Sequence, residues 1–475
     1  MKQSFKAHPL MILSFLKPFL FVLLIPVIRG VSEYIKNGEI TQILGIEILL
    51  FGAILLFAIL RWRAFSVECD EKVVVVKTGV FAVSRAVIPI KGLSSVQSEQ
   101  TPVDYIFSSV TFRINTEAGS RERTDYSFKL SRRDSHALSD LLYGKKSGEP
   151  VRFSPFKIAI LAAATSSAFT GMLVGVPVVN NAAKLLGLGF EELFNEITNI
   201  SNKIETYFPP VVNTISLILL IGYVISFVYS FLRYLSFRLF LNDDRIEVRS
   251  GFFVKLRTSF KKASINNIKI EQTFLMMLFR RFAMKVNVGG YGEAKSESQV
   301  LVPSGKYSEI RNEYSDYFPF LKPTGKVVMS KKGLIHQNRF LFWAEIFFIS
   351  LGLLAFYMAY RFEEFGRFIL FMTFIIGCVI FYYAYLCLRE YKKGMVRFGE
   401  TVYASGKKGL RSCQLYCPKE RVGEIKLIRF PPDMYFKTCK VKITVRSETA
   451  DNITIRHLDF DKVKQEIFNC YAIKE

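Results

Sequence analysis

Few residues of this 475-residue chain are spaced for catalysis or metal binding. The run VPSGKYS at 302–308 contains the Gly-Lys pair of a phosphate-binding loop, but it lacks the preceding glycine spacing and a Ser or Thr directly after the lysine. The four histidines fall in separate segments, and three residues separate Cys413 from Cys417 with no second Cys or His pair nearby. We therefore expect no enzymatic activity, no cofactor and no metal site.

The composition points to a membrane protein instead. Half of the residues are hydrophobic. The chain has 64 Lys and Arg but 41 Asp and Glu, and this positive net charge suits binding to nucleic acid or to an anionic membrane surface. The basic residues gather beside long apolar stretches, so we expect a membrane and no nucleic acid. Seven scattered cysteines are an odd number, which indicates reduced thiols facing the cytosol.

Six apolar stretches are long enough to cross a bilayer as helices, which takes about 20 residues. They occupy residues 10–28, 41–60, 156–179, 211–231, 340–360 and 368–388. Segment 10–28 contains two prolines and no small-residue cleavage pattern, so it is interpreted as a retained span and not a signal peptide. The spacing predicts transmembrane hairpins at 1–60, 151–232 and 326–390, alternating with domains at 61–150, 233–325 and 391–475.

Charges flanking the spans predict the orientation. Lys and Arg cluster at the domain-side ends, whereas Glu dominates the hairpin tips. The sequence therefore predicts a multi-pass protein of the cell membrane with six spans, three cytoplasmic domains and both termini in the cytoplasm. The second tip, 180–210, has apolar residues at helical spacing; it either lies on the outer membrane surface or packs on its own hairpin.

Charges inside the spans are the remaining chemical candidates. An unpaired charge in hydrocarbon costs on the order of 3 kcal/mol on insertion scales, so such residues usually have a partner. Lys17 in the first span and Glu345 in the fifth fall at similar depth, and they form a candidate intramembrane pair. Alternatively, Lys17 extends to the interface and Glu345 lies at the interface.

An internal repeat organises the predicted domains. SSVQSEQTPVDYIF at 94–107 shares the core Glu-Gln-Thr with NNIKIEQTFLMMLF at 266–279, and the same offset of 172 superimposes Gly79 on Gly251 and Phe107 on Phe279. A third, diverged copy follows residue 399. Pro418 and Pro432 are 14 residues apart where Pro89 and Pro102 are 13 apart, so this copy is predicted to carry one inserted residue.

The residue pattern of each copy predicts several strands followed by one helix. β-branched runs at 71–81 and 244–253 are interrupted by Thr-Gly and Ser-Gly pairs, which suit tight turns. Further strands are expected at 109–115, 282–288, 440–445 and 452–458, and helices around 132–142, 307–317 and 461–471.

A hairpin of spans followed by such a domain resembles the bacterial PH-like domain membrane proteins of the YdbS/YdbT group, in its larger, three-domain form. The residues that carry the resemblance are Gly79, Arg85, 97–102, Gly251, Arg257 and 269–274. The resemblance implies α-helical membrane hairpins with three α+β, β-rich modules, each of two antiparallel sheets capped by a helix. It also implies a smaller single-domain relative as partner and a link to antimicrobial-peptide resistance. It implies no phosphoinositide ligand.

The repeated runs are the candidate interaction sites. Apolar residues beside a basic pair can enter the headgroup region while the arginines meet lipid phosphates, each basic contact being worth about 1 kcal/mol. Equally, the same residues can close the domain core or join domain to domain. The candidates are Glu99, Gln100, Thr101, Glu271, Gln272, Thr273, Met276, Met277, Phe279, Arg280 and Arg281.

These features predict a non-catalytic membrane scaffold whose cytoplasmic domains contact proteins or lipid headgroups in envelope maintenance. The alternative is a transporter or exporter component for peptides or small solutes. Transport needs polar clusters or broken helices at midplane, and the third span offers only Thr165, Ser166, Ser167 and Thr170, which suit helix packing as well.

Overall fold

The computed structural model describes residues 3–16, 19, 43–116, 126–143, 149–167, 210–242, 244–288, 298–330, 334–361, 363–446 and 451–471. These residues form two compact units. Unit 1 comprises Met1–Val151 and Arg238–Ser264, and unit 2 comprises Arg152–Phe237, Ile265–Val288 and Ser298–Glu475. Each unit is described separately.

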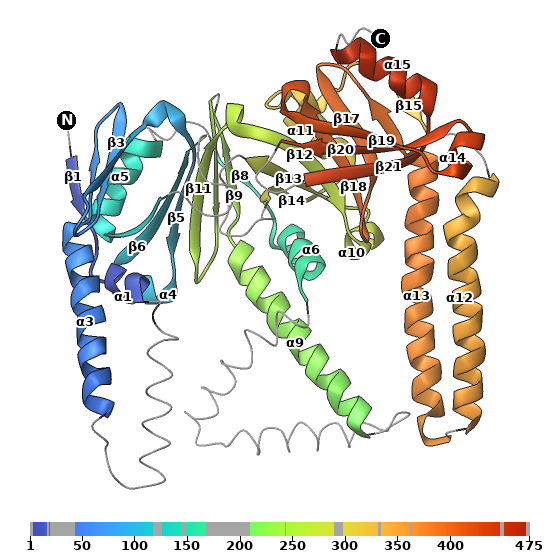
Figure 1. Cartoon of the computed structure of the whole chain (residues 1–475), viewed down its shortest axis with the longest axis horizontal. Helices are drawn as coiled ribbons and strands as arrows, with labels where there is room; N and C mark the ends of the chain where they lie inside the picture. Colours follow the sequence, from blue (N-terminus) through green and yellow to red (C-terminus); the bar gives the residue numbers. More distant parts are fainter. Residues whose placement is uncertain are drawn as a thin grey trace. The chain divides into compact units, whose positions relative to one another are not determined.

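Unit 1 contains two antiparallel sheets around one core (Figure 1). The four-stranded sheet has the order β1 (Gln3–Lys6), β2 (Ser66–Cys69), β3 (Val73–Thr78), β4 (Ser84–Pro89). The seven-stranded sheet has the order β7 (Tyr126–Ser131), β6 (Ser109–Thr116), β5 (Leu93–Gln100), β11 (Lys255–Lys261), β10 (Arg245–Ser250), β9 (Arg238–Leu241), β8 (Val151–Arg152). Alternate residues of these strands, such as Val74 and Val76, point into the core, and helix α5 (Arg132–Tyr143) adds Leu138 and Leu142.

Unit 2 is built on one ten-stranded sheet. Its main path is β14 (Gln299–Gly305), β13 (Phe282–Val288), β12 (Ile265–Gln272), β18 (Arg411–Pro418), β17 (Thr401–Lys408), β21 (Asp451–Asp459), β20 (Thr438–Val445), β19 (Val422–Ile428). β15 (Val327–Met329) pairs with β16 (Met395–Arg397), which also pairs with β17. The short helices α11 (Tyr307–Tyr314) and α15 (Phe460–Tyr471) follow β14 and β21, and η4 (Pro319–Leu321) follows α11.

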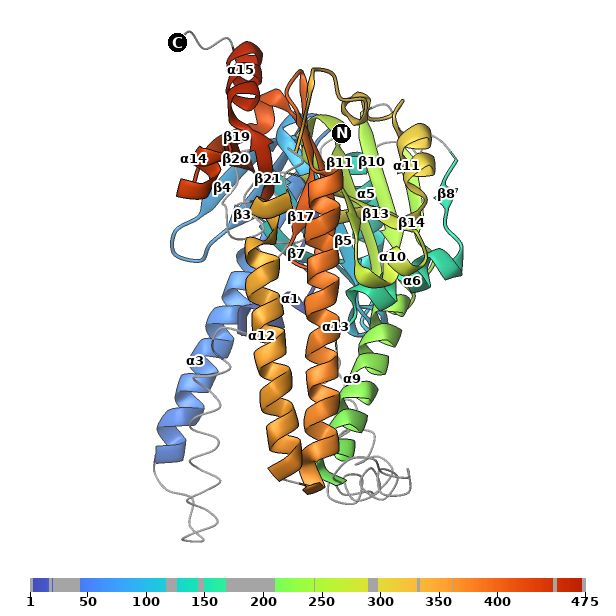
Figure 2. The ribbon, with the colours of Figure 1, turned by 90° about the vertical axis from the view of Figure 1, so that its right-hand side faces the viewer.

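Apolar helices extend from the sheets of each unit. In unit 1, α3 (Ile43–Ala64) runs away from the sheets beside the short α1 (Met11–Leu16) (Figure 1). In unit 2, α9 (Pro210–Tyr234), α12 (Leu334–Arg361) and α13 (Glu363–Lys393) leave the sheet on the same side, and α6 (Pro155–Thr165) packs against α9 (Figures 1 and 2). α12 and α13 lie side by side, with the rings of Phe348 and Phe381 5.8 Å apart.

Two of the six predicted spans are matched by helices long and apolar enough to cross a membrane. Within the described residues these are Leu217–Tyr234 and Thr373–Lys393, with Pro155–Thr165 and Ile346–Met358 as shorter apolar helices. Most of segment 10–28, the second half of 156–179 and residues 180–209 lie outside the described residues. The complete set of six spans therefore stays a prediction.

The repeat is visible as a strand–short helix–strand arrangement that recurs three times. These units, which we call tip units, are β5–α4–β6, β12–α10–β13 and β19–α14–β20, with α4 at Pro102–Ile106, α10 at Phe274–Leu278 and α14 at Pro431–Tyr435. A 3-10 turn precedes each: η2 (Ile90–Gly92), η3 (Lys262–Ser264) and η5 (Lys419–Arg421). Two residues after each short helix the backbone is left-handed, with φ of 53° at Ser108, 50° at Arg280 and 50° at Lys437.

The predicted insertion in the third copy is wrong. Helix α14 begins at Pro431, not Pro432, so Pro418 and Pro431 are 13 residues apart, like Pro89 and Pro102. The sequence suggested the insertion because two consecutive prolines offered two pairings. The structure selects the first, since a proline is well tolerated at the first position of a helix, where its missing N–H has no partner to lose.

The hairpin turns allow a matched test of backbone strain. Gly79, between β3 and β4, has φ of 111°, and an added Cβ would lie 1.9 Å from the carbonyl oxygen of Ala82. Gly409, in the corresponding turn between β17 and β18, has φ of 58° with no other heavy atom within 4 Å of an added Cβ. We predict that Gly79→Ala destabilises its hairpin by more than about 2 kcal/mol, and Gly409→Ala by about 1 kcal/mol.

Hydrogen–deuterium exchange of the full chain, read separately over β3–β4 and β17–β18, measures both effects. Equal increases in exchange for the two variants would contradict the steric explanation.

Candidate functional site

The glutamates of the repeated runs lie in strands and form ion pairs. Glu99 Oε2 lies 2.5 Å from Arg113 Nη1 on the neighbouring β6, and Glu271 Oε2 lies 2.9 Å from Lys285 Nζ on β13. Burial of Glu271 opposes its ionisation, but the charges of Lys285, Lys269 and Arg411 outweigh burial and lower its pKa. Both glutamates therefore stabilise cross-strand pairs.

The glutamines of the repeated runs link the two strands of the first and second tip units at the ends next to the short helix. Gln100 Nε2 donates to the carbonyl oxygen of Ser109 at 3.3 Å, and Gln272 Nε2 donates to that of Arg281 at 3.0 Å. Each bond joins the end of the first strand to the backbone nine residues later, across the short helix. Gln272 Oε1 also accepts from Arg389 Nη1 of α13 at 2.7 Å, so the second tip unit is tied to an apolar helix.

The threonines start the short helices. Thr101 Oγ1 accepts from the backbone N–H of Asp104 at 3.2 Å, and Thr273 Oγ1 accepts from that of Met276 at 3.5 Å. Each satisfies a helix N–H that has no partner within the helix. The Glu-Gln-Thr sequence is thus repeated because it builds a strand end, a closure and a helix cap.

Asp104 is a residue that sequence reasoning missed. Its buried carboxylate accepts from Lys129 Nζ at 2.5 Å, from Ser109 Oγ at 2.6 Å and from Thr101 Oγ1 at 2.8 Å. Burial opposes ionisation, but these hydrogen bonds, led by that from Lys129, hold the pKa of Asp104 below its ordinary value.

The third tip unit has an aspartate at the same position, whereas the second does not. Asp433 of the third tip unit accepts hydrogen bonds from the backbone N–H of Phe430 at 3.0 Å and from Thr438 Oγ1 at 3.3 Å. In the second tip unit, the buried Met276 occupies the position of this aspartate. A repeated aspartate was therefore not visible in the two most similar copies.

Exposed apolar side chains project from all three short helices and the residues beside them. Ile106 is 75% exposed, Leu278 is 70% exposed and Tyr435 is 84% exposed. The other members are Val103, Tyr105, Phe107, Phe274, Phe279, Phe430, Met434 and Phe436. Of the predicted contact residues only Phe279 belongs to this set; Met276 is buried, Met277 is half-buried, and Arg280 and Arg281 follow the helix.

In unit 2 the second tip unit lies against the apolar helices. The ring of Phe274 lies 4.9 Å from that of Tyr382 on α13, and the ring of Phe279 lies 6.2 Å from that of Phe156 on α6. Tyr382 Oη also donates to the carbonyl oxygen of Leu410, in the β17–β18 turn, at 2.9 Å. Helix α10 and this turn are therefore on the side of unit 2 from which α9, α12 and α13 leave (Figure 1).

Unit 1 repeats part of this arrangement. Phe81, 90% exposed in the β3–β4 turn, stacks on Phe57 of α3 with ring centroids 6.3 Å apart. Tyr105 of α4 lies beneath two cations, Arg132 at 5.9 Å and Lys255 at 5.6 Å from its ring centroid. Tyrosine is enriched at boundaries between water and an apolar phase, and cations over its ring are attracted to it.

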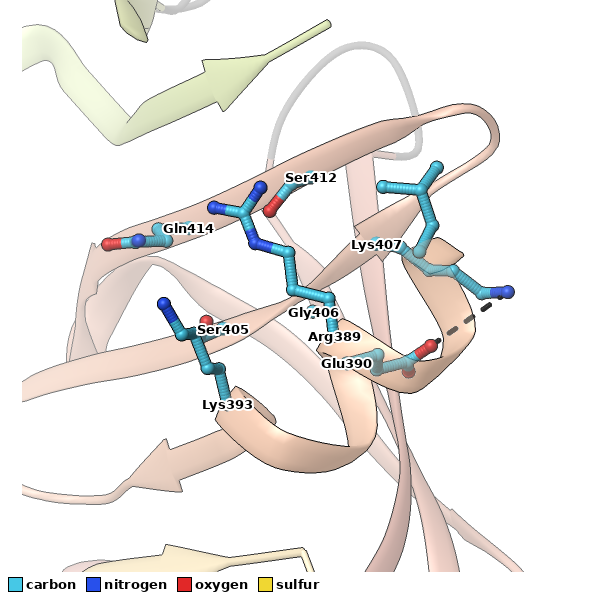
Figure 3. A pocket seen from close by; sticks show the side chains of 9 residues that line it. Arg389, Glu390, Lys393, Ser405, Gly406, Lys407, Ser412 and Gln414 are labelled. Carbon is cyan, nitrogen blue, oxygen red and sulfur yellow. Dashed lines mark ion pairs between the residues drawn. The ribbon is translucent and has the colours of Figure 1, made fainter. Parts of the chain in front are cut away.

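A basic pocket lies where α13 enters the sheet of unit 2 (Figure 3). It has an empty volume of about 320 Å³, including space open to solvent, and Arg389, Lys393 and Lys407 are among its lining residues. Arg389 is bonded to Gln272, and Lys407 Nζ lies 4.0 Å from Glu390 Oε2 and 3.8 Å from the ring centroid of Tyr383. These contacts hold α13 against the sheet of unit 2.

The remaining candidates are located as follows. Glu345 lies in α12, but Lys17 lies outside the described residues, so their pairing stays a prediction. Cys413 and Cys417 are buried, reduced thiols. Within the described residues, no group of three or more His, Cys, Asp or Glu side chains could hold a metal ion.

Comparison with known proteins adds two findings. The family described as Bacterial PH domain matches residues 18–146 and 184–317. The transmembrane protein YdbT of Bacillus subtilis (strain 168) is 20% identical over 312 residues, which cover 60% of this chain and 60% of that relative, less than two thirds of its length. No solved structure matches the chain.

The environment of Asp104 predicts how stability depends on pH. Because the pKa of Asp104 is lower in the folded than in the unfolded chain, its contribution is present above the unfolded pKa of about 3.9 and is lost as pH falls through the folded pKa. We predict that Asp104→Asn lowers the stability of the first tip unit by about 1–3 kcal/mol at neutral pH. The difference from wild type should shrink below pH 4 or so.

Thermal unfolding of the full chain in detergent at several pH values measures this difference. Asp140→Asn, on the exposed side of α5, is the control and should change little. A deficit of Asp104→Asn that is constant down to pH 2 or so would contradict the assigned role.

Proposed function

This chain belongs to the bacterial PH domain family, and from that membership we propose that it is a non-catalytic membrane scaffold. Its β-rich domains have the antiparallel sheets expected of PH-like folds. The relative from Bacillus subtilis is named a transmembrane protein, and two helices of this chain are long and apolar enough to cross a membrane. Within the proposal, three hairpins at 1–60, 151–232 and 326–390 hold three PH-like modules at 61–150, 233–325 and 391–475 on the cytoplasmic face of the cell membrane.

The observation that carries the proposal is the position of α10 beside the apolar helices. Phe274 and Phe279 contact α13 and α6, while Leu278 on the same short helix is exposed. If α13 spans the bilayer up to the level of Tyr382, then α10 and Leu410 lie at the headgroup level, where exposed aromatic and aliphatic side chains are stabilised. The last turns of α13, with the buried Leu386 and Glu390, then lie inside the cytoplasmic domain.

The tip units therefore fix the distance between each sheet and the membrane. Strand ends, helix caps and the buried Asp104 or Met276 hold the short helices rigid, so the exposed side chains are presented without a large ordering cost. Direct lipid contact by Ile106, Leu278 and Phe279 belongs to this proposal, as does a role for Arg280 and Arg281 near lipid phosphates.

Transport, the alternative function, gains no support from the described part of the third span, residues 156–167. Thr165 Oγ1 and Ser166 Oγ donate to the backbone carbonyls of Leu161 and Ala162, and the N–H of Ser167 donates to Ser226 Oγ of α9 at 3.1 Å. These hydroxyls serve helix packing. A smaller single-domain relative as partner, and a part in envelope maintenance or antimicrobial-peptide resistance, stay predictions.

Lipid contact is tested by tryptophan fluorescence in bilayers. We predict that tryptophan at position 106 or 278, introduced by Ile106→Trp or Leu278→Trp, is quenched by brominated acyl chains in phosphatidylcholine–phosphatidylglycerol vesicles. Asp140→Trp in α5 is the control and should not be quenched above the background of the two native tryptophans. Absence of quenching at both tip positions would remove lipid contact from the proposal.

Orientation is tested by cysteine labelling in intact cells. In a Cys378→Ser, Cys387→Ser, Cys470→Ser background, Val103→Cys in α4 should resist a membrane-impermeant maleimide until the membrane is permeabilised. Glu33→Cys, in the first predicted outer tip, should react in intact cells. Labelling of Val103→Cys from outside would invert the proposed topology.

A further inference from the structure

Two sheet junctions in this chain use the same strand pairing. In unit 1, β5 pairs antiparallel with β11, with Gln100 opposite Lys255 and Gln97 opposite Thr258. In unit 2, β12 pairs antiparallel with β18, with Gln272 opposite Ser412 and Lys269 opposite Leu415. In each case the first strand of one tip unit pairs with the last strand of the following hairpin.

The two junctions also have the same register. Lys255 and Ser412 both correspond to Val83 of the first copy, under offsets of 172 and 329. The offset of 329 also relates α4 to α14 and the start of β6 to the start of β20. A register conserved between two independent junctions is a property of the repeat itself.

Each junction is reinforced by the helix that ends the preceding copy. Arg245 Nη1 on β10 donates to the carbonyl oxygen of Leu142 in α5. In unit 2 the hydroxyls of Tyr307 in α11 and Tyr416 on β18 lie 2.9 Å apart, and Tyr416 is fully buried. At each junction, the strand of the preceding copy therefore covers an edge of the following hairpin, and the helix of the preceding copy covers one of its faces.

The first hairpin and the last tip unit have the same kinds of edge without these partners. Among the described strands, β4 pairs with β3 and β19 pairs with β20, and each ends its sheet. β4 corresponds to β11 and β18, and β19 corresponds to β5 and β12. Val87 on β4 is 63% exposed, whereas its counterparts Ser259 and Tyr416 are buried. β12 is buried along its whole length, but Gly423, Glu424 and Lys426 of β19 are exposed.

The two edges are complementary when the shared register is applied to them. Val87 would lie opposite Ile425, Arg85 opposite Leu427 and Ala86 opposite Lys426. Val83 would take the place that Lys255 has over Tyr105, which brings it to Met434, the counterpart of Tyr105 on α14. Val87 and Ile425 form an apolar pair of the kind that stabilises antiparallel strands, and none of the three pairs places like charges opposite each other.

We propose that β19 of one copy of this chain pairs with β4 of a second copy, in the register of the two internal junctions. This inference extends the proposed scaffold function by naming one protein partner and its surface. The contact is heterologous, because different surfaces meet, so repetition gives a ring or an open row in the membrane plane. Pairing removes two exposed edges that would otherwise be open to non-specific association.

Cross-linking of two singly substituted chains tests the proposal. Ala86→Cys and Lys426→Cys, each in a Cys378→Ser, Cys387→Ser, Cys470→Ser background, carry different tags and are reconstituted together in phosphatidylcholine–phosphatidylglycerol vesicles. The four cysteines that remain are buried, and burial raises the pKa of Cys69 to about 11 and that of Cys439 to about 12, so they react slowly with maleimides. A short bis-maleimide should join the two tags, because directly opposed Cβ atoms lie about 5 Å apart.

A matched control uses the opposite edge of the same sheet. Ser4→Cys on β1 lies three strands from β4, about 14 Å away, so it should give no product with Lys426→Cys. Val87→Lys, added to the Ala86→Cys chain, places a charge opposite Ile425 and should reduce the product about fivefold. Val87→Thr should leave it nearly unchanged. Because Val87 is exposed, neither change should affect folding.

The outcomes separate this inference from the proposed function. A mixed-tag product for positions 86 and 426 that Val87→Lys reduces supports pairing of two copies. No product, although both cysteines react fully with a fluorescent maleimide, overturns it, as does equal product from Ser4→Cys. Tryptophan quenching at position 106 without cross-linking keeps the lipid-contacting scaffold and rejects only the strand pairing.

Discussion

Backbone hydrogen bonding at sheet edges is the constraint on which the rest of this structure depends. A strand at an edge carries N–H and C=O groups that must bond to another strand or to water. Within each unit the chain meets this requirement by pairing the first strand of one tip unit with the hairpin of the next copy, β5 with β11 and β12 with β18. Duplication of the module therefore supplied the partner strands together with the modules, and the sheets continue through the junctions without a separate interface.

The tip units depend on this continuity. Glu99, Glu271, Gln100 and Gln272 lie at the ends of the paired strands, and their ion pairs and hydrogen bonds fix where the chain leaves the sheet. A threonine cap then begins a five-residue helix whose remaining side chains project outward. Such a short helix would be marginal alone, because helix nucleation is unfavourable, so its stability comes from the cap and the anchored residue at its centre.

The same geometry changes the meaning of the repeated sequence. The run Glu-Gln-Thr attracted attention because it occurs twice, and conserved-looking polar residues suggest a binding site. In the structure these residues build the tip, and the side chains available for contact are the variable apolar ones that follow, such as Ile106, Leu278 and Tyr435. Their identity differs among the copies, which the proposed lipid contact allows because it requires only apolar character and exposure.

The sequence by itself determined the local elements of this protein. The offset of 172, the β-branched runs and the glycine turns predicted the strands at 109–115 and 282–288, the closing helices at 132–142 and 461–471 and the long apolar helices of unit 2, because each depends on neighbouring residues. Only the tertiary structure decided that β5 pairs with β11, that α14 begins at Pro431 and that Asp104 is a buried anchor. The strand pairing and the ion pair of Asp104 depend on partners 25 to more than 150 residues away in sequence, and local periodicity carries no information about such partners.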